Sequence, residues 1–527
     1  MSHKKRLWPA YILLLLVALG FRLFIALRLA NDEPDDGRVY AQIAINVLEQ
    51  HVFSHENQPP YVPSIIRLPG YPLFLAGVYK LFGHGNNTAV RVVQAGIDTL
   101  TCVLIALVAF QWVDEERKHR AALIAFALAA VCPFTAIYVA TVLTEVPTNF
   151  LAVATVLAAT FAFKATDNTD RRKAALWWVV AGLIAGVAVL FRPDSGLFAA
   201  AVGGTLVCSV FLRRRLKPFV VSAVFFSLAF CVVLVPWTIR NYRVFHFFQP
   251  LSPAHGEMPG EFVPRGYLLW LRTWLDDSRY IGPVLWAEDT RPIPLSAFPA
   301  SAFDSDEERA RVAALLDKYN NLSQSASSAD EEADSEEDSD DEDQPENEEP
   351  ETENEETQTE PQEPEEPDVE MTPEIDAGFA QLGQERRARS PFRYYVVLPL
   401  KRAETLWCDT HSQYYPFNGE LLPLKDLDYN IHQQYWLPLF AALTALYSLL
   451  GVVGAGLLWL SRARNARVWV LLAALVIVVR LGFFATLENP EPRYTVELFP
   501  FLIILAGAGW SRLGASDASR SSGWWRG

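Results

Sequence analysis

The chain has 527 residues, 51% of them hydrophobic, and a formal net charge of −16. The charge has a local origin, because 24 acidic residues and no Lys or Arg lie between Asp330 and Glu370, and elsewhere 37 acidic residues face 45 basic ones. The five cysteines show neither disulfide nor zinc spacing, which argues against a disulfide-rich or zinc-binding scaffold, and we expect no nucleic-acid partner.

The apolar residues form long blocks separated by short charged joints. A helix needs about 20 apolar residues, and at least about 17, to cross the hydrocarbon core. Backbone groups in lipid must be paired within their own segment, so we predict an all-α multi-pass membrane protein of about ten spans. We expect the first block to be an uncleaved anchor. The blocks are Trp8–Leu27, Ala89–Val113, Ala121–Ala140, Pro147–Phe163, Ala174–Phe191, Gly196–Leu212, Phe219–Trp237, Trp436–Leu460, Val468–Phe484 and the marginal Val496–Trp510, which contains Glu497.

Basic joints predict the orientation, since Lys and Arg gather in short cytoplasmic loops. With ten spans, six basic joints fall on one side, and both termini are expected to be cytoplasmic. The apolar stretch Pro69–Gly83 has only 15 residues and contains Lys80, so we interpret it as a surface or re-entrant helix on the outer side. The joints are Lys4–Arg6, Glu115–Arg120, Thr169–Lys173, Arg213–Lys217, Ser461–Arg467 and the tail from Arg512.

Three regions follow from this pattern. Residues 1–240 form an N-terminal membrane module with a first outer loop at 29–88. Residues 241–435 form an outer region, and 436–527 hold the last helices and a cytoplasmic tail. The acidic insert, 325–372, lacks large apolar residues and is predicted to be a disordered spacer, with ion binding as the alternative. The aromatic stretch Gly266–Trp286 is expected either to lie on the outer leaflet or to form the core of a small subdomain.

Four carboxylates stand in the first outer loop, directly after the first block. We interpret Asp32, Glu33 and Asp35 as solvated loop charges. Asp36 lies four residues before Tyr40, so both would share one face of a helix continuing through "YAQIAINVLEQ". The alternative is that Asp36 is only the N-cap of that helix, because Gly37 is unfavourable inside it.

Further ionisable residues lie at outer span ends, where a charge facing a cavity indicates function. Arginines at outward span ends are unexpected under the positive-inside bias, and with two carboxylate sites they favour a shared anionic ligand. The alternative for any single arginine is that it reaches toward lipid headgroups. These candidates are Glu145, as a catalytic residue beside Asp36, and, as substrate-binding residues, Arg67, Arg192, Arg240, Arg493 and Tyr494.

Several motifs carry a family resemblance. Their order resembles that of GT-C membrane glycosyltransferases of the dolichyl- or polyprenyl-phosphate-mannose type, which include protein O-mannosyltransferases and bacterial enzymes that add aminoarabinose to lipid A. The resemblance covers about 8–248 and 435–510 and leaves out the acidic insert. The motifs are "DDGRVYAQIAINVLEQHVFS", "RLPGYPLFLAGVYKLFG", "AVRVVQ", "RPDSGLF", "VPWTIRNYRVF" and "EPRYTVELFPFLIILAG".

The resemblance implies that Asp36 is the catalytic carboxylate. It also places Glu145 where oligosaccharyltransferases of the same fold carry a metal-binding acidic pair. Here the pair is reduced to Thr144–Glu145, so a divalent metal at Asp36 and Glu145 is left open, and no other cofactor is implied. The resemblance places Arg240 and Arg493 near the mouth of the cavity, where they would bind the donor phosphate.

The resemblance implies an inverting transfer from a polyprenyl-phosphate sugar to a lipid, glycan or protein acceptor on the outer face of a membrane, here the bacterial inner membrane. A carboxylate at the membrane surface would act as general base, and arginines would neutralise the leaving phosphate. Three alternatives stay open: a flippase or transporter of lipid-linked sugars, a polymerase or ligase of surface polysaccharide, and a non-catalytic scaffold. Transporters typically show repeats and broken helices at the midplane, whereas the candidate charges here gather on one face.

The acidic run is expected to be dispensable for chemistry. Deleting Asp330–Glu370 removes no apolar block and no outer arginine. We expect membrane insertion and sugar transfer to survive, as measured by membrane fractionation and a transfer assay, with a change confined to recruitment of the acceptor. Loss of all transfer in a well-folded deletion variant would instead place the run in the active site.

Overall fold

The computed structural model describes residues 7–29, 35–213, 216–288, 291–337, 371–415, 431–461 and 463–513, without the side chains of 323–337 and 431–433. These residues are helical or irregular, and they contain no β-strand. The chain divides into two compact units. The N-terminal and C-terminal membrane regions, expected as separate modules, belong to one unit. Unit 1 comprises Met1–Glu261, Leu406–Phe483 and Pro492–Gly527, and unit 2 comprises Phe262–Thr405 and Phe484–Glu491.

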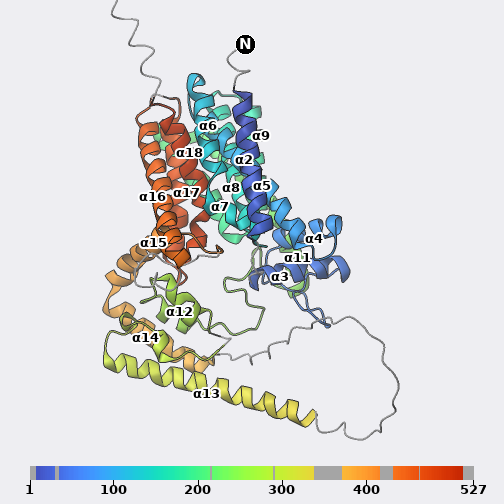
Figure 1. Ribbon diagram of the computed structural model, residues 1–527, viewed down its shortest axis with the longest axis vertical. Coiled ribbons are helices and arrows are strands. Elements are labelled where there is room, and N and C mark those ends of the chain that lie inside the picture. The colour runs from blue at the N-terminus through green and yellow to red at the C-terminus, as the bar shows by residue number, and fades with distance from the viewer. Residues whose placement is uncertain are drawn as a thin grey trace, which may run out of the picture. The chain divides into compact units, whose positions relative to one another are not determined.

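Unit 1 is a bundle of long apolar helices, shown in Figure 1. Among the described residues, eight helices are long and apolar enough to cross a membrane, and one bent pair raises the number to nine. The predicted all-α multi-pass architecture is therefore confirmed. The eight spans contain α2 (Trp8–Arg28), α5 (Asn87–Gln111), α8 (Glu145–Asp167), α9 (Arg171–Phe191), α10 (Gly196–Arg213), α11 (Leu216–Phe245), α16 (Ile431–Trp459) and α17 (Ala466–Ala485).

The tenth apolar block is not a full span. It is divided between a 3₁₀ segment, η10 (Pro492–Leu498), and a short helix, α18 (Phe499–Trp510). Twelve residues of α-helix extend about 18 Å, which is less than the thickness of a hydrocarbon core. Every residue of α18 before Trp510 is buried, so α18 packs inside the bundle against α5, α6 and α16. The block is apolar because it lies in the protein core.

The third block is broken. Helix α6 (Lys118–Ala130) meets α7 (Pro133–Ala136) at an angle of 54° between the two halves of the pair. Pro133 provides no N–H group, so carbonyls at the end of α6 need other donors. The buried Arg22 guanidinium donates to the carbonyls of Ala130 at 2.8 Å and Ala129 at 3.0 Å, and to the Asp98 carboxylate at 2.7 Å. The buried ion pair therefore stabilises the break.

The described residues of several predicted basic joints meet at one end of the bundle. Arg120, at the start of α6, donates to the carbonyl of Leu513 after α18 at 2.6 Å. Lys164, near the end of α8, donates to Gln111 at the end of α5 at 2.7 Å. These contacts agree with the inference from charge that the joints lie on one side. The joints around α10 and α17 meet the same terminus of α8 through Asp167, Arg213 and Asn465.

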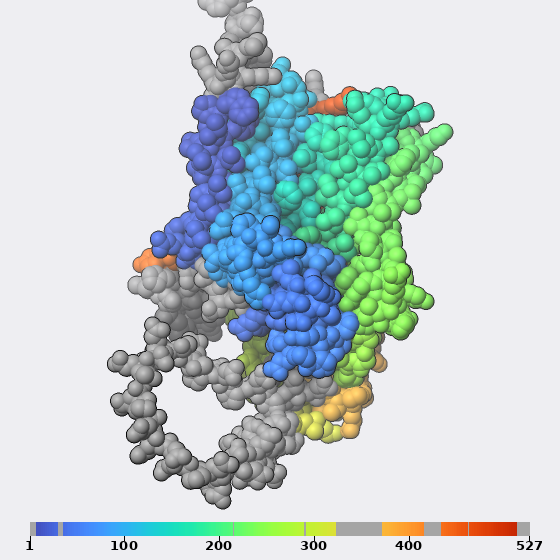
Figure 2. Space-filling model, turned by 90° about the vertical axis from the view of Figure 1, so that its right-hand side faces the viewer, coloured from blue at the N-terminus to red at the C-terminus, as the bar shows by residue number. Residues whose placement is uncertain are grey.

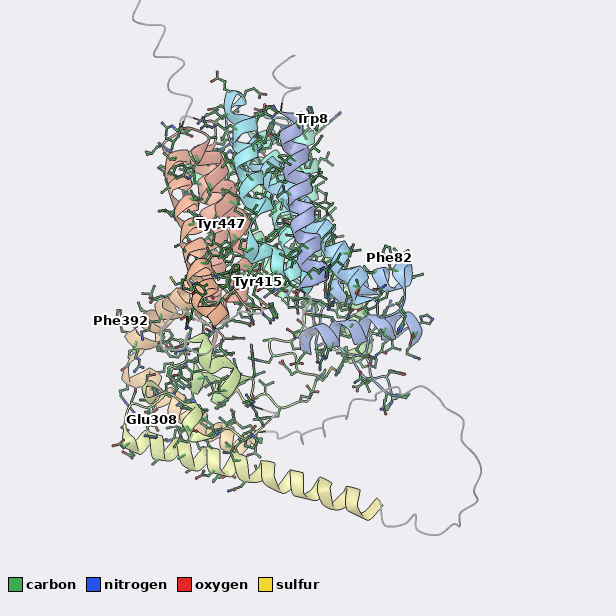
Figure 3. The ribbon with its side chains drawn as sticks, in the orientation of Figure 1. Trp8, Phe82, Glu308, Phe392, Tyr415 and Tyr447 are labelled. Carbon is green, nitrogen blue, oxygen red and sulfur yellow. The ribbon has the colours of Figure 1, made fainter. Side chains whose placement is uncertain are left out.

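Two amphipathic helices lie at the other end of unit 1. Helices α3 (Asp35–Glu49) and α4 (Gly70–Phe82) lie across the axis of the spanning helices and pack on each other, as Figures 1 and 2 show. Helix α4 has 13 residues and is not among the candidate spans, which agrees with the predicted surface helix. Leu81 and Phe82 are exposed at its tip, where Figure 3 labels Phe82.

Unit 2 has its own hydrophobic core. The aromatic stretch around α12 (Arg265–Leu271) supplies buried side chains that include Tyr267, Trp270 and Trp274, so this stretch is a packed core and not a leaflet-binding segment. The other helices are α13 (Asp306–Glu337), α14 (Pro373–Arg389), the π-helical η8 (Arg393–Val397) and α15 (Leu398–Cys408).

The acidic insert is only partly described. Residues 325–337 of the insert are described as the last part of helix α13. Residues 338–370 lie outside the described residues, as do Asp32 and Glu33.

Helices α16 and α18 approach each other through glycines, as helices in membranes often do. A Cβ added at Gly454 would lie 2.4 Å from the carbonyl oxygen of Leu505, and one added at Gly509 would lie 2.0 Å from that of Gly454. Two residues further along α16, a Cβ at Gly456 would meet nothing within 4 Å. The close approach therefore depends on Gly454 and Gly509 in particular.

We expect Gly454→Ala to separate α16 from α18 and to destabilise the protein by about 1–3 kcal/mol, the usual cost of overpacking. Gly456→Ala is the matched control and is expected to be neutral or slightly stabilising, because Ala favours the helix. Thermal unfolding in detergent measures both changes. Equal melting temperatures for the two variants would contradict the packing described here.

Candidate functional site

Asp36 lies in the first turn of α3 and binds two arginines from distant parts of unit 1. Its Oδ1 accepts a hydrogen bond from Arg67 Nη2 at 2.7 Å, and its Oδ2 accepts one from Arg493 Nη2 at 3.3 Å. Arg67 also lies over the Tyr40 ring, 5.7 Å from its centroid, so Asp36 and Tyr40 share one face of α3 as predicted. The helix begins at Asp35, so Asp36 is inside the first turn and not at the N-cap.

The Asp36 group is open to solvent and carries a net positive charge. Side-chain exposure is 33% for Asp36, 26% for Arg67 and 16% for Arg493. Burial by itself would raise the pKa of Asp36, but the charges of Arg67 and Arg493 outweigh it and hold the pKa below its ordinary value. Asp36 is therefore ionised at neutral pH, and it loses its charge only as the pH falls through this lowered pKa.

A second group of charges is buried behind the first. Arg192 binds Glu145 at 2.8 Å, Asp194 at 3.0 Å and Glu497 at 3.1 Å. Arg480, within the apolar span α17, binds Asp194 at 2.7 Å and Glu497 at 2.9 Å. Three carboxylates thus share two guanidinium groups. Arg480 and Glu497 are fully buried, so this group is closed to solvent.

Tyr494 connects the two groups. Arg192 and Arg493 lie over its ring, 5.4 Å and 5.5 Å from the centroid. Arg480 Nε donates to its backbone carbonyl at 2.8 Å, which fixes the segment that carries Arg493. The buried group therefore holds Tyr494 in place, and Tyr494 supports the arginine that binds Asp36.

Tyr40 lies beneath the guanidinium group of Arg67. Burial raises its pKa to about 12, and the charges of Arg67, Asp36, Arg192 and Glu145 all act on it. Its hydroxyl group is therefore protonated at neutral pH. Tyr40 thus lies within electrostatic range of both charge groups and extends the site along α3.

Arg240 does not join the Asp36 group. Its guanidinium donates to the carbonyls of Ser64 at 2.8 Å and Phe53 at 3.5 Å, and it lies over the rings of Phe53, Trp237 and Phe245. These contacts attach the end of α11 to the first loop. Of the residues predicted to bind substrate, the structure brings Arg67, Arg192, Arg493 and Tyr494 together, whereas Arg240 binds carbonyls of the first loop.

The carboxylates do not form a metal site. No group of three or more His, Cys, Asp or Glu side chains placed to hold a metal ion occurs in the described part of the chain. Both oxygens of Asp36 accept hydrogen bonds from arginines, and Glu145 is bound by Arg192. These residues therefore do not fit the divalent metal that the family resemblance left open.

Sequence reasoning missed two residues that support the site. Arg480 is flanked by apolar residues in "LVIVVRLGFF", and a lone charge within a span is a signal that could have identified it. Tyr414, whose hydroxyl accepts from Arg493 Nη1 at 3.3 Å, gave no such signal. It lies in an irregular segment that only the tertiary structure brings to the site.

Comparisons with known proteins agree with the motifs. Residues 62–238 match the family model described as dolichyl-phosphate-mannose-protein mannosyltransferase, which confirms the resemblance over a segment that includes Arg67, Glu145 and Arg192. Asp36 and Arg493 lie outside that segment. A search of curated proteins found no significant match.

Solved structures give more distant similarities. An oligosaccharyltransferase from Archaeoglobus fulgidus, tethered to an acceptor peptide, matches with a TM-score of 0.45 and 13% identity over 96% of this chain and 50% of that chain. ArnT from Cupriavidus metallidurans, bound to undecaprenyl phosphate, matches with a TM-score of 0.33 and 14% identity over 95% of this chain and 78% of that chain. The chain thus spans about half the length of the oligosaccharyltransferase.

The buried group predicts losses of stability of different size for two neutralising changes. Arg480→Gln leaves three carboxylates on one arginine, and breaking a buried pair in this way costs about 3–5 kcal/mol. Glu497→Gln leaves two carboxylates on two arginines, so we expect a much smaller loss. The melting temperature in detergent measures both, and equal losses would contradict the charge balance described here.

Proposed function

Residues 62–238 match the dolichyl-phosphate-mannose-protein mannosyltransferase family, and from this premise we propose that the chain is a GT-C membrane glycosyltransferase. It moves a sugar from a polyprenyl-phosphate donor to a lipid, glycan or protein acceptor, with inversion at the anomeric carbon. The reaction takes place at the end of the bundle opposite the basic joints, which we assign to the outer face of a bacterial inner membrane, with both termini cytoplasmic.

One observation carries this proposal: Arg67 and Arg493, which are 426 positions apart in the sequence, converge on the partly exposed Asp36. Two guanidinium groups around one carboxylate leave a net positive charge that suits a phosphate. A flippase breaks no sugar–phosphate bond and needs no general base, and neither does a scaffold. The donor phosphate is therefore assigned to Arg67 and Arg493, in place of Arg240 and Arg493.

The same geometry assigns the proton. When the donor phosphate binds Arg67 and Arg493, it competes with Asp36 for their N–H groups, and the pKa of Asp36 rises toward that of a useful base. The acceptor hydroxyl oxygen then attacks the anomeric carbon and its proton passes to Asp36. The bond from the sugar to the phosphate oxygen breaks, and its electron pair stays with the phosphate, whose added charge the two arginines stabilise.

Glu145 is assigned an indirect part in this reaction. It is buried and bound to Arg192, and Arg192 supports Tyr494. A carboxylate in that position cannot reach an acceptor without breaking its ion pair. We therefore propose that Asp36 alone acts as the base and that Glu145 positions the phosphate-binding segment through Arg192 and Tyr494.

Transfer by the purified protein in lipid nanodiscs tests the proposed function. Polyprenyl-phosphate sugars are supplied as donors, and free polyprenyl phosphate is detected by mass spectrometry. The acceptor is identified by mass spectrometry of surface lipids and proteins from cells with and without the protein. Movement of the intact lipid-linked sugar across the bilayer without release of polyprenyl phosphate would support a flippase and reject the transferase.

Asp36→Asn is expected to abolish transfer, because the amide cannot accept the proton. The variant is expected to remain folded and inserted, since Asp36 is partly exposed. Asp35→Asn is the matched control, because Asp35 is the exposed neighbour in the same turn. We expect this change, and the corresponding changes at Asp32 and Glu33, to leave transfer almost unchanged. Full activity of Asp36→Asn in the transfer assay would reject Asp36 as the base.

Arg67→Lys and Arg493→Lys are expected to weaken donor binding even though the charge is kept, because Lys lacks the planar fork of donors. Losing a charge-assisted hydrogen bond costs about 1.5–3 kcal/mol, which is roughly a 10- to 100-fold loss of affinity. The apparent affinity for donor lipid measures the effect, and the acceptor affinity is expected to change little.

The control for this experiment is Arg38→Lys, at an exposed position of the same helix as Asp36. It removes an arginine fork near the site without touching the Asp36 group. Unchanged donor affinity in both the Arg67 and Arg493 variants would move the phosphate site elsewhere.

A further inference from the structure

The helical segment formed by η8 and α15 in unit 2 has two different faces. One face is fixed to the core of unit 2. Leu398 and Arg402 are buried, and the Arg402 guanidinium donates to the carbonyls of Leu275 at 2.7 Å and Arg272 at 2.6 Å. Thr405, on the same face, donates to the carbonyl of Asp276 at 2.6 Å. The orientation of the segment within unit 2 is therefore set by hydrogen bonds.

The opposite face is apolar and exposed. Phe392 is 70% exposed, Tyr395 62% and Leu400 66%, and Val396 between them is also exposed. Their spacing of one helical turn aligns them in a single stripe. Figure 3 labels Phe392 at the rim of unit 2. Soluble proteins seldom leave such a stripe uncovered, so it marks a surface that binds something apolar.

The segment is anchored close to the end of a membrane span. Arg272, whose carbonyl accepts from Arg402, donates through Nε and Nη2 to the Glu488 carboxylate. Glu488 is three residues beyond Ala485, where the span α17 ends. Three residues reach at most about 11 Å, so this anchor lies near the boundary of the bilayer. Arg493 follows five residues later, so the boundary is the one on the side of the Asp36 group.

The composition of the segment suits a membrane surface. It combines exposed aromatic and aliphatic side chains with Arg393 and Lys401, and tyrosines and basic residues are typical of the zone between headgroups and hydrocarbon. The two basic residues are bound to Asp304 at 3.2 Å and Asp276 at 3.1 Å, which places their charges on the side of unit 2. The uncharged stripe is left as the surface for contact.

We propose that the stripe Phe392, Tyr395, Val396 and Leu400 lies in the surface of the lipid bilayer, on the side where the Asp36 group lies. This interfacial helix attaches unit 2 to that leaflet. The occupant of the stripe is phospholipid, and neither a second protein nor another copy of this chain is needed to cover it. The assignment does not depend on the proposed sugar transfer.

Spin labels in the full chain test the proposal. Cys208, Cys231 and Cys408 are replaced by serine, and the two buried cysteines, Cys102 and Cys132, are kept. Single labels are then placed by Tyr395→Cys or Leu400→Cys in protein reconstituted in phosphatidylcholine and phosphatidylglycerol bilayers. The matched control is Lys401→Cys, at an exposed position of the same helix whose native side chain binds Asp276 and lies off the stripe.

We expect the ratio of collisions with oxygen to collisions with a water-soluble nickel chelate to be several-fold higher for the labels at 395 and 400 than for the label at 401. Equal, water-like ratios at all three positions would overturn the proposal. Labels at 395 and 400 shielded from both reagents would also overturn it, since they would show that protein covers the stripe.

A second measurement keeps all five cysteines. A benzophenone amino acid at position 395 is expected to give an adduct with the mass of a phospholipid on illumination, whereas the same group at 401 is not. A protein adduct at 395, or no lipid adduct above the level at 401, would reject the bilayer as the occupant.

Discussion

The structure depends on neutralising charge inside an apolar bundle. Arg192 and Arg480 are shared by Glu145, Asp194 and Glu497. The side chains of these five residues are at most 11% exposed, so water cannot take the place of a lost ion-pair partner. A buried charge that loses its partner costs about 3–5 kcal/mol, so these residues hold one another in a single arrangement. Through them the starts of α8 and α10 are tied to α17 and η10. Segments from both halves of the chain are thereby fixed at one end of the bundle.

The consequence for the site is a division between a closed group and an open one. The closed group has an excess of carboxylate and holds Tyr494 through its ring and its backbone carbonyl. The open group has an excess of arginine and exposes part of Asp36, Arg67 and Arg493. An anionic ligand is therefore attracted to the open group, while the closed group keeps Arg493 in position. Positioning and binding are carried by different residues, as preorganised sites require.

Unit 2 shows how similar amphipathic signals lead to different environments. The stretch around α12 and the segment around α15 are both rich in aromatic residues. Trp270 and Trp274 are buried in the core of unit 2, whereas Phe392 and Tyr395 are exposed. The difference lies in the partners: α12 packs on α14, while α15 offers only one face to the core and is fixed there by Arg402. Periodicity alone carries no information about such partners.

The sequence by itself determined the membrane class, most of the spans, their common side and the position of Asp36 beside Tyr40. These features are local: a span is a long apolar run, sidedness is the charge of short joints, and Asp36 with Tyr40 is a four-residue spacing. Only the tertiary structure decided that Val496–Trp510 is a buried short helix, that Arg240 binds the first loop, and that Arg67 and Arg493 meet at Asp36. Those outcomes depend on contacts between residues up to 457 positions apart, as for Asp36 and Arg493, and no local pattern specifies which distant charge will become the partner of another.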